Sequence, residues 1–221
     1  MRRKRFQGIL FGPQGSGKST QGKLLSQYFQ VPYYSSGDMF RRDMEEQTRL
    51  GSMVSEYVGS GMLAPDELVD AIIKKYVSAE DFSHGFILDG YPRNVEQAMT
   101  LDKLQKINLA IQIKFSDEEA VKRLGGRLQC DKCRELFHET LLPKSERNKC
   151  TVCGGKLRKR EDDKESIIRK RLAAYRFMTE PMARYYREKG VLLAVNGGQD
   201  IPDLFEELIR KTTRLGFHPM H

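Results

Sequence analysis

The segment Gly8-Ile-Leu-Phe-Gly-Pro-Gln-Gly-Ser-Gly-Lys-Ser19 decides the fold. Its first five residues are a short apolar run typical of a buried strand, and residues 12–19 match G-x-x-x-x-G-K-[ST] in full. Leu25 and Phe29 have the i,i+4 spacing of a helix that follows directly. A glycine loop between a strand and a helix turns successive N–H groups towards one anion. The segment therefore predicts a binding loop for a nucleoside triphosphate.

Within this loop we expect contacts to the triphosphate from Gly15, Ser16, Gly17, Lys18, Ser19 and Thr20. Lys18 can reach the β- and γ-phosphates, and a hydroxyl of Ser19 or Thr20 can serve a phosphate or Mg²⁺. The alternative is a glycine-rich turn with a surface lysine. The agreement of motif and context disfavours that alternative.

Strand-like and helix-like segments alternate along the rest of the chain. Further strand candidates are Phe86–Asp89, Ala110–Phe115 and Val191–Val195, with helical periodicity between them. Ser116 and Glu119 form a capping box, and Pro181 is expected to break or kink the helical stretch 164–189. The alternation predicts an α/β fold: a parallel sheet with helices on both faces and nucleotides at the carboxyl ends of the strands.

The composition is that of an ordinary globular chain. Of 221 residues, 39% are hydrophobic and 31% charged, which excludes disordered and fibrous classes. No apolar run approaches the roughly 20 residues of a membrane span, and the apolar run after the basic Met1–Arg5 is too short for a signal peptide. We therefore expect a soluble cytoplasmic protein that needs no membrane. The net charge of +8 favours anionic partners without choosing among them.

Four cysteines lie in a segment without helical periodicity, residues 126–163, which we read as an inserted lobe. Cys130, Cys133, Cys150 and Cys153 have the spacing Cys-x2-Cys-x16-Cys-x2-Cys. Four thiolates complete a tetrahedral zinc site with no open position, so the metal would be structural. Iron or cobalt could also occupy such a site, and four unliganded thiols are the remaining alternative. A zinc ribbon that binds nucleic acid is a rival function, although Phe137 is the only aromatic residue in the lobe.

Five motifs, in order, resemble those of adenylate kinases. Asp89-Gly-Tyr-Pro-Arg-Asn-Val-Glu-Gln97 is similar to D-G-[FY]-P-R-x-x-x-Q, and Ser35-Ser-Gly-Asp-Met-Phe-Arg41 is similar to S-[TS]-G-D-[ML]-[LF]-R. Three further segments of that family are similar to Gly61–Glu67, Arg160–Asp163 and Arg169–Leu172. The resemblance covers nearly the whole chain and is closest to the bacterial type with a long zinc-bearing lid. It implies the nucleoside monophosphate kinase fold.

The resemblance also implies the reaction, ATP + AMP ⇌ 2 ADP, which is Mg²⁺-dependent, serves adenine nucleotide homeostasis and needs no phosphoenzyme. Arginine suits such transfer because its planar, permanently charged fork grips phosphate. By resemblance, the catalytic groups are Lys18, Asp89, Arg93, Arg123, Arg160 and Arg171. Beyond the loop, ATP contacts Arg123, Arg127, Leu136, Phe137 and Gln199. AMP contacts Ser36, Arg41, Met62, Leu63, Ala64, Gly90, Tyr91, Pro92, Arg93, Gln97, Arg160 and Arg171.

Residues 1–221 are expected to form one kinase unit that acts as a monomer and has no nucleic-acid partner. Two segments of it are expected to move: 35–64 over AMP, and 126–163, the lid, over ATP. Some assignments stay open. Gln97 and Ser36 could each belong to a helix cap, Phe137 could belong to the lid core, and the acceptor could be UMP or CMP instead of AMP.

Overall fold

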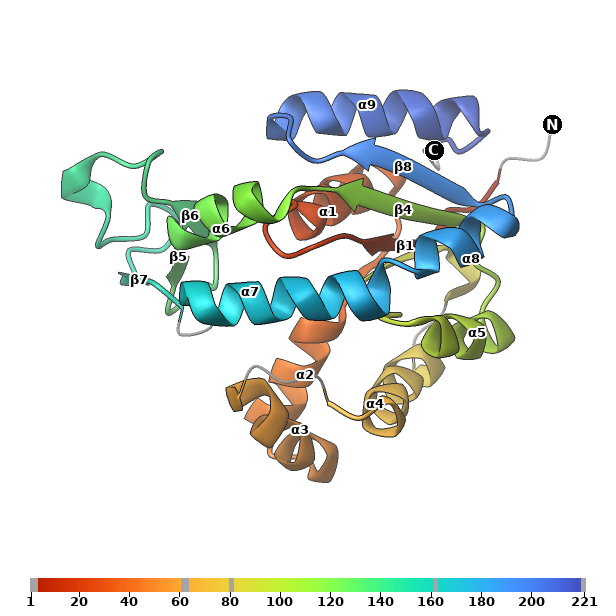
Figure 1. The fold of residues 1–221 in the computed structure, drawn as a ribbon, viewed down its shortest axis with the longest axis horizontal. Helices are drawn as coiled ribbons and strands as arrows, with labels where there is room; N and C mark the ends of the chain where they lie inside the picture. The colour runs from red at the N-terminus through yellow and green to blue at the C-terminus, as the bar shows by residue number, and fades with distance from the viewer. Residues whose placement is uncertain (1–3, 61–63, 80–81, 161–162, 220–221) are drawn as a thin grey trace.

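A parallel sheet of five strands forms the centre of the molecule (Figure 1). The computed structural model describes residues 4–60, 64–79, 82–160 and 163–219. The strands are β1 (Gln7–Phe11), β2 (Tyr33–Ser35), β3 (Phe86–Asp89), β4 (Leu109–Lys114) and β8 (Leu192–Asn196), in the order β2-β3-β1-β4-β8. Ile9 of β1 lies opposite Leu88 of β3 and Ala110 of β4. The carboxyl ends of β1 and β3 are therefore neighbours, which places the glycine loop beside Asp89.

Alternate residues of the strands bury against helices on the two faces of the sheet, as expected from the sequence. Leu10 packs in one cluster with residues of α1 (Lys18–Phe29) and α9 (Ile201–Arg214). Ile9 and Phe11 pack in another with residues of α5 (Val95–Leu104) and α8 (Met182–Glu188). Both clusters are nearly free of solvent exposure. The period-2 pattern of the central strand thus fixes a doubly wound α/β fold.

Three helices form a separate bundle beyond β2: α2 (Ser36–Glu45), α3 (Arg49–Ser60) and α4 (Asp66–Ala79), the last followed by a single turn, η1 (Phe82–His84). A buried carboxylate holds the bundle together. Asp43 of α2 accepts hydrogen bonds from Thr48 Oγ1 at 2.7 Å and from Lys75 Nζ of α4 at 2.7 Å. This bundle coincides with most of segment 35–64, and α4 extends it.

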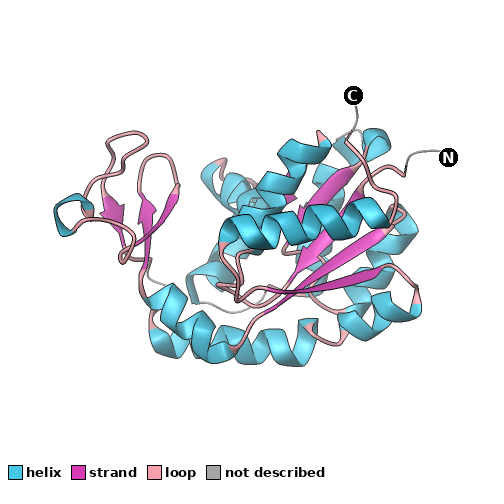
Figure 2. Ribbon diagram, turned by 90° about the horizontal axis from the view of Figure 1, so that it is seen from above, coloured by secondary structure: helices cyan, strands magenta, loops and turns pink. Residues whose placement is uncertain are grey.

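The lid lies between α6 (Asp117–Gly125) and α7 (Glu165–Ala174) and projects away from the central sheet (Figure 2). Its antiparallel sheet has the order β6-β5-β7, from β5 (Arg127–Cys130), β6 (Leu136–His138) and β7 (Leu157–Arg158). A single 3-10 turn, η2 (Lys144–Glu146), lies between β6 and β7. An ion pair joins the lid to the helical bundle: Arg134 Nη2 lies 3.2 Å from Glu45 Oε1 of α2.

The helical stretch before Pro181 is interrupted, as its sequence predicts. The interruption begins earlier than the proline, with π-helical turns over η4 (Tyr175–Thr179) between α7 and α8. The capping box of Ser116 and Glu119 is present at the start of α6. Among the described residues, no helix combines the length and apolar character that a membrane crossing requires.

Candidate active site

The glycine loop joins β1 to α1 and leaves the helix start open to an anion. Gly15 and Gly17 adopt φ of 80° and 84°, a region that glycine reaches without steric cost. Gly17 is the N-cap residue of α1, and the first turn of the helix contains no acidic residue. The unpaired N–H groups of a helix N-terminus carry positive potential. The loop therefore has the backbone geometry of a phosphate site.

Several cations converge on Lys18. Burial lowers the pKa of Lys18, Asp89 opposes that shift, and the charges of Arg171, Arg93 and Arg127 lower it further. The pKa of Arg93 is lowered too, first by burial and then by Arg171. Four cations around one carboxylate repel one another unless a polyanion joins them. The arrangement is therefore suited to a ligand with several phosphate oxygens.

Asp89 ends β3 with 3% of its surface exposed. Its Oδ2 accepts hydrogen bonds from Ser19 Oγ at 2.5 Å and from Tyr33 Oη at 2.7 Å. Its Oδ1 is buried and has no hydrogen-bond partner among the described residues. Hard oxygen ligands, a carboxylate and a hydroxyl, are what Mg²⁺ or its bound water prefers. The residues present therefore fit the Mg²⁺ that accompanies ATP, and Ser19 is the loop hydroxyl that reaches this carboxylate.

The remaining arginines approach from α6 and the lid. Arg123 Nη1 donates to the Gly15 carbonyl at 3.0 Å, and its guanidinium carbon lies 4.4 Å from the centroid of the Phe115 ring. Arg127 pairs with Asp163 through two hydrogen bonds, of 2.8 and 2.5 Å, which join the two ends of the lid. Arg160 follows β7 within the lid.

The expected AMP side lies around the β3–α5 connection and α2. Ser36 is buried, and its Oγ has no hydrogen-bond partner among the described residues. The cap of α2 is Ser35, whose Oγ accepts from Asp38 N, so the alternative that Ser36 serves as the cap is wrong. Arg41, one turn into α2, pairs with Asp38. An orphaned buried hydroxyl at the start of α2 is what a bound ligand would satisfy.

The Asp-Gly-Tyr-Pro-Arg segment is held from several sides. Tyr91 is buried and donates to Asp70 at 2.8 Å, and Pro92 follows through a cis peptide bond. Arg93 Nε donates to the Gly90 carbonyl at 2.7 Å. Ala64 packs against the hydrophobic core cluster that includes Tyr91, whereas Met62 and Leu63 lie outside the described residues.

Gln97 uses both ends of its amide. Its Oε1 accepts from Arg93 N and its Nε2 donates to Asp66 Oδ1, each at 2.7 Å. Asn94 caps α5 through Gln97 N at 2.8 Å, so the reciprocal cap that the sequence suggested reaches Arg93 instead of Asn94. Each amide end keeps one further hydrogen-bonding position. Capping and base binding are therefore compatible in the same side chain.

The residues expected near the ATP base are spread out. Leu136 is 43% exposed on the lid. Phe137 packs against the lid core, in agreement with its alternative role. The Gln199 side chain donates to the Asn196 carbonyl at 3.0 Å and to Glu207 at 2.5 Å.

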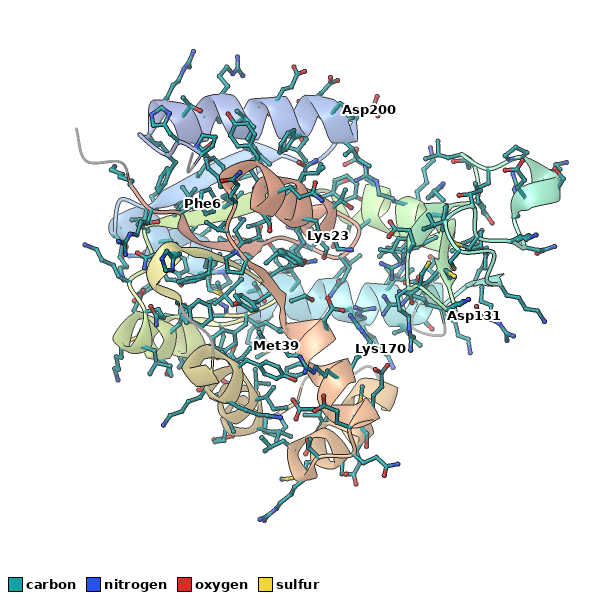
Figure 3. All side chains as sticks on the ribbon, turned by 180° about the vertical axis from the view of Figure 1, so that it is seen from behind. Phe6, Lys23, Met39, Asp131, Lys170 and Asp200 are labelled. Carbon is teal, nitrogen blue, oxygen red and sulfur yellow. The ribbon has the colours of Figure 1, made fainter. Side chains whose placement is uncertain are left out.

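The four cysteine sulfurs lie together in the lid, beside Asp131 in Figure 3. All four Sγ atoms lie within 4.8 Å of one another. The Cys130–Cys153 and Cys133–Cys150 sulfur separations are 3.4 and 3.6 Å. Thiolates of a tetrahedral zinc site, with Zn–S of about 2.3 Å, lie about 3.8 Å apart. The cluster fits a four-thiolate metal ion.

Comparison with known proteins agrees with this geometry. Residues 10–191 match the family model described as adenylate kinase. The chain is 41% identical over 207 residues to an adenylate kinase of Caldicellulosiruptor bescii, covering 91% of this chain and 96% of the relative. It is 42% identical over 205 residues to an adenylate kinase of Archaeoglobus fulgidus, covering 90% and 94%. The chain belongs to the adenylate kinase family.

Membership of the adenylate kinase family confirms the predicted fold class and activity, the phosphotransfer ATP + AMP ⇌ 2 ADP. Sequence reasoning missed two groups in this kinase. Tyr33 lies on β2, whose three residues are all partly buried, so the sequence of this strand shows no recognisable strand pattern. Asp66 lies within the 61–67 segment but was given no role of its own, yet it joins Gln97 and Asn94. The run Tyr33-Tyr34 before the Ser35 motif was the one available signal for β2.

Proposed function

We propose that this kinase transfers the γ-phosphoryl group directly between nucleotides bound at the carboxyl ends of β1 and β3. The observation that supports this most strongly is the group of cations formed by Lys18, Arg93, Arg127 and Arg171 around Asp89. Transfer between two phosphates gathers negative charge, and fixed cations in a dry site stabilise it without reorganisation.

On the ATP side, the loop N–H groups and Lys18 bind the phosphates, and Arg123 and Arg127 approach them from the lid side. Arg123 is held by the Gly15 carbonyl, and Arg127 by Asp163. Asp89 and Ser19 hold Mg²⁺ or its water shell. Bound Mg²⁺ supplies neutralisation of the β- and γ-phosphate charge.

On the AMP side, Arg41 and Arg93 bind the phosphate while Ser36 and Gln97 face the base. Asp66 fixes which end of the Gln97 amide is the donor, because a carboxylate accepts only from Nε2. Oε1 is then the acceptor end of the amide. Adenine offers a ring nitrogen acceptor next to an amino donor, which matches an amide with a fixed orientation. Met62, Leu63, Ala64, Gly90, Tyr91 and Pro92 complete the AMP site.

Closure of segments 35–64 and 126–163 brings Arg160 of the lid over the transferring group, where it joins Arg171 of α7, and excludes the water that would hydrolyse ATP. Leu136, Phe137 and Gln199 line the ATP base. The lid metal is zinc, held by four cysteines in a closed structural site. The protein works as a cytoplasmic monomer without nucleic-acid partners.

The test compares two arginines of the same helix. Arg171→Ala should lower kcat by about 100-fold or more, the size found when a group that stabilises transition-state charge is removed. Arg169→Ala is the matched control, since Arg169 is exposed and pairs with Glu165 one turn away. Both variants should keep the wild-type melting temperature. Equal, small losses of kcat in the two variants would contradict the assignment.

A further inference from the structure

Asp89 receives two hydroxyl donors on a single oxygen. Ser19 from α1 and Tyr33 from β2 both donate to Oδ2, at 2.5 and 2.7 Å. The other oxygen, Oδ1, is buried without a hydrogen-bond partner among the described residues. Leaving a carboxylate oxygen buried and unpaired is unfavourable. The two donors on Oδ2 therefore hold the carboxylate in an orientation that keeps Oδ1 available.

The Tyr33 ring has little freedom to move. A Cβ placed on Gly22 of α1 would lie 2.5 Å from Tyr33 Cε2, so the absence of a side chain at Gly22 makes room for the ring. In the β2–β3 register Tyr33 lies opposite Ile87, and Ser35 lies opposite Asp89. The ring therefore leans forward along the sheet between α1 and β3, and its hydroxyl reaches the end of β3.

The two hydroxyls reach Oδ2 from different places. Tyr33 donates from a ring that is confined between Gly22 of α1 and β3. Ser19 donates from the first turn of α1, directly after the glycine loop, and its lone pairs remain available to a cation bound beside the phosphates.

We propose that Tyr33 is a positioning residue for divalent metal use. It holds Oδ2 of Asp89, so that Oδ1 and the lone pairs of Ser19 remain available to the Mg²⁺ of MgATP, and it does not itself touch the metal. This inference rests on the proposed function, in which Asp89 and Ser19 serve Mg²⁺. It assigns to β2 a part in ATP binding, in addition to the link that β2 makes to the AMP segment.

The test measures nucleotide binding by calorimetry, with and without metal, in Tyr33→Phe. We expect MgATP to bind at least about tenfold more weakly, the effect of losing one hydrogen bond to a charged group, and ATP in excess chelator to bind as it does to wild type. The Mg²⁺ concentration for half-maximal ADP formation should rise by a similar factor. The KM for AMP should not change.

Two further variants make the result specific. Tyr28→Phe on α1 is the matched control, because Tyr28 is 37% exposed and packs against Phe29 and Phe205 through its ring. In an Asp89→Asn background, Tyr33→Phe should have no further effect on MgATP binding.

The possible outcomes separate the two proposals. Equal weakening of MgATP and metal-free ATP in Tyr33→Phe, or no weakening of either, would overturn the role of Tyr33 and leave Asp89 as the metal group. If Asp89→Asn itself bound MgATP like wild type, the metal role of Asp89 in the proposed function would fail first. The inference is supported if Tyr33→Phe weakens the binding of MgATP but not of metal-free ATP, and if it has no such effect in the Asp89→Asn background.

Discussion

Removing one cysteine should unfold the lid and leave the kinase core intact. The buried apolar core of the lid is small: Leu128 and Leu157, each 7% exposed, are its only buried hydrophobic side chains besides Cys130 and Cys150 in the described part of the chain. Two buried leucines contribute roughly 3–6 kcal/mol. A structural zinc site contributes roughly 10–16 kcal/mol of apparent binding free energy. The proposed zinc ion would therefore dominate the local stability of the lid.

The perturbation is Cys130→Ser. The matched control is Lys132→Ala, which changes an exposed residue between Cys130 and Cys133. Hydrogen–deuterium exchange with mass spectrometry measures the lid peptides and the β4 peptides in one experiment. In Cys130→Ser we expect loss of bound metal and at least about 100-fold faster exchange in residues 127–158, corresponding to 2.7 kcal/mol or more of lost local stability. Exchange in β4 should not change.

Chelation of the metal from wild type should reproduce the Cys130→Ser pattern, and Lys132→Ala should behave like the untreated protein. A lid that stayed protected after complete metal removal would refute the reasoning. Its stability would then come from the protein contacts alone.

Three further substitutions test other parts of the structure. Asp66→Ala should raise the KM for AMP by about tenfold with little change in the KM for ATP, because Gln97 loses the acceptor that orients its amide; initial rates at varied AMP measure this. Burial pushes the pKa of Asp43 up, but hydrogen bonds from groups including Lys75 lower it overall, so its contribution to stability is present above its unfolded pKa and lost as pH falls through the folded pKa. Asp43→Asn should therefore flatten the acid limb of stability against pH, followed by urea unfolding between pH 2 and 5. Leu208→Ala, at a fully buried position of α9, should lower the free energy of unfolding by about 2–5 kcal/mol, measured by denaturant titration with kcat unchanged at low temperature.

Each of these three has a contrary result. Equal rises in the KM for ATP and AMP would show that Asp66 supports the whole fold and not the base site. An unchanged acid limb in Asp43→Asn would remove Asp43 from the pH dependence. A loss below about 0.5 kcal/mol for Leu208→Ala would mean that α9 is not packed as described.

The features that could be predicted from sequence are those carried by short local patterns. The glycine loop, the capping box at Ser116 and the cysteine pairs each specify their own geometry within a few residues. The parallel sheet followed because apolar runs alternate with helical periods, and only helices on both faces can cover such strands. Local rules sufficed where local structure and function coincide.

The features that could not be predicted depend on contacts between distant segments. β2 has three residues, all partly buried, and forms only because β3 offers a free edge. The link from Asp66 to Gln97 spans 31 positions, and that from Tyr33 to Asp89 spans 56. Neither pairing can be predicted from the spacing of the residues in the sequence. Ser35 and Ser36 are neighbours, so choosing Ser35 as the cap of α2 requires the start of the helix to be known to one residue. That is finer than the usual error of a predicted helix boundary.

The central claim is that this chain phosphorylates AMP, and a coupled assay of ADP formation tests it most directly. MgATP is held constant while AMP, CMP, UMP and GMP are supplied in turn, with Arg93→Ala as the inactive reference. We expect kcat/KM to be highest with AMP and at least about 100-fold lower with UMP, since the Gln97 amide oriented by Asp66 matches the ring nitrogen acceptor and amino donor of adenine, a pair that uracil lacks. A higher kcat/KM with CMP, UMP or GMP than with AMP would contradict it.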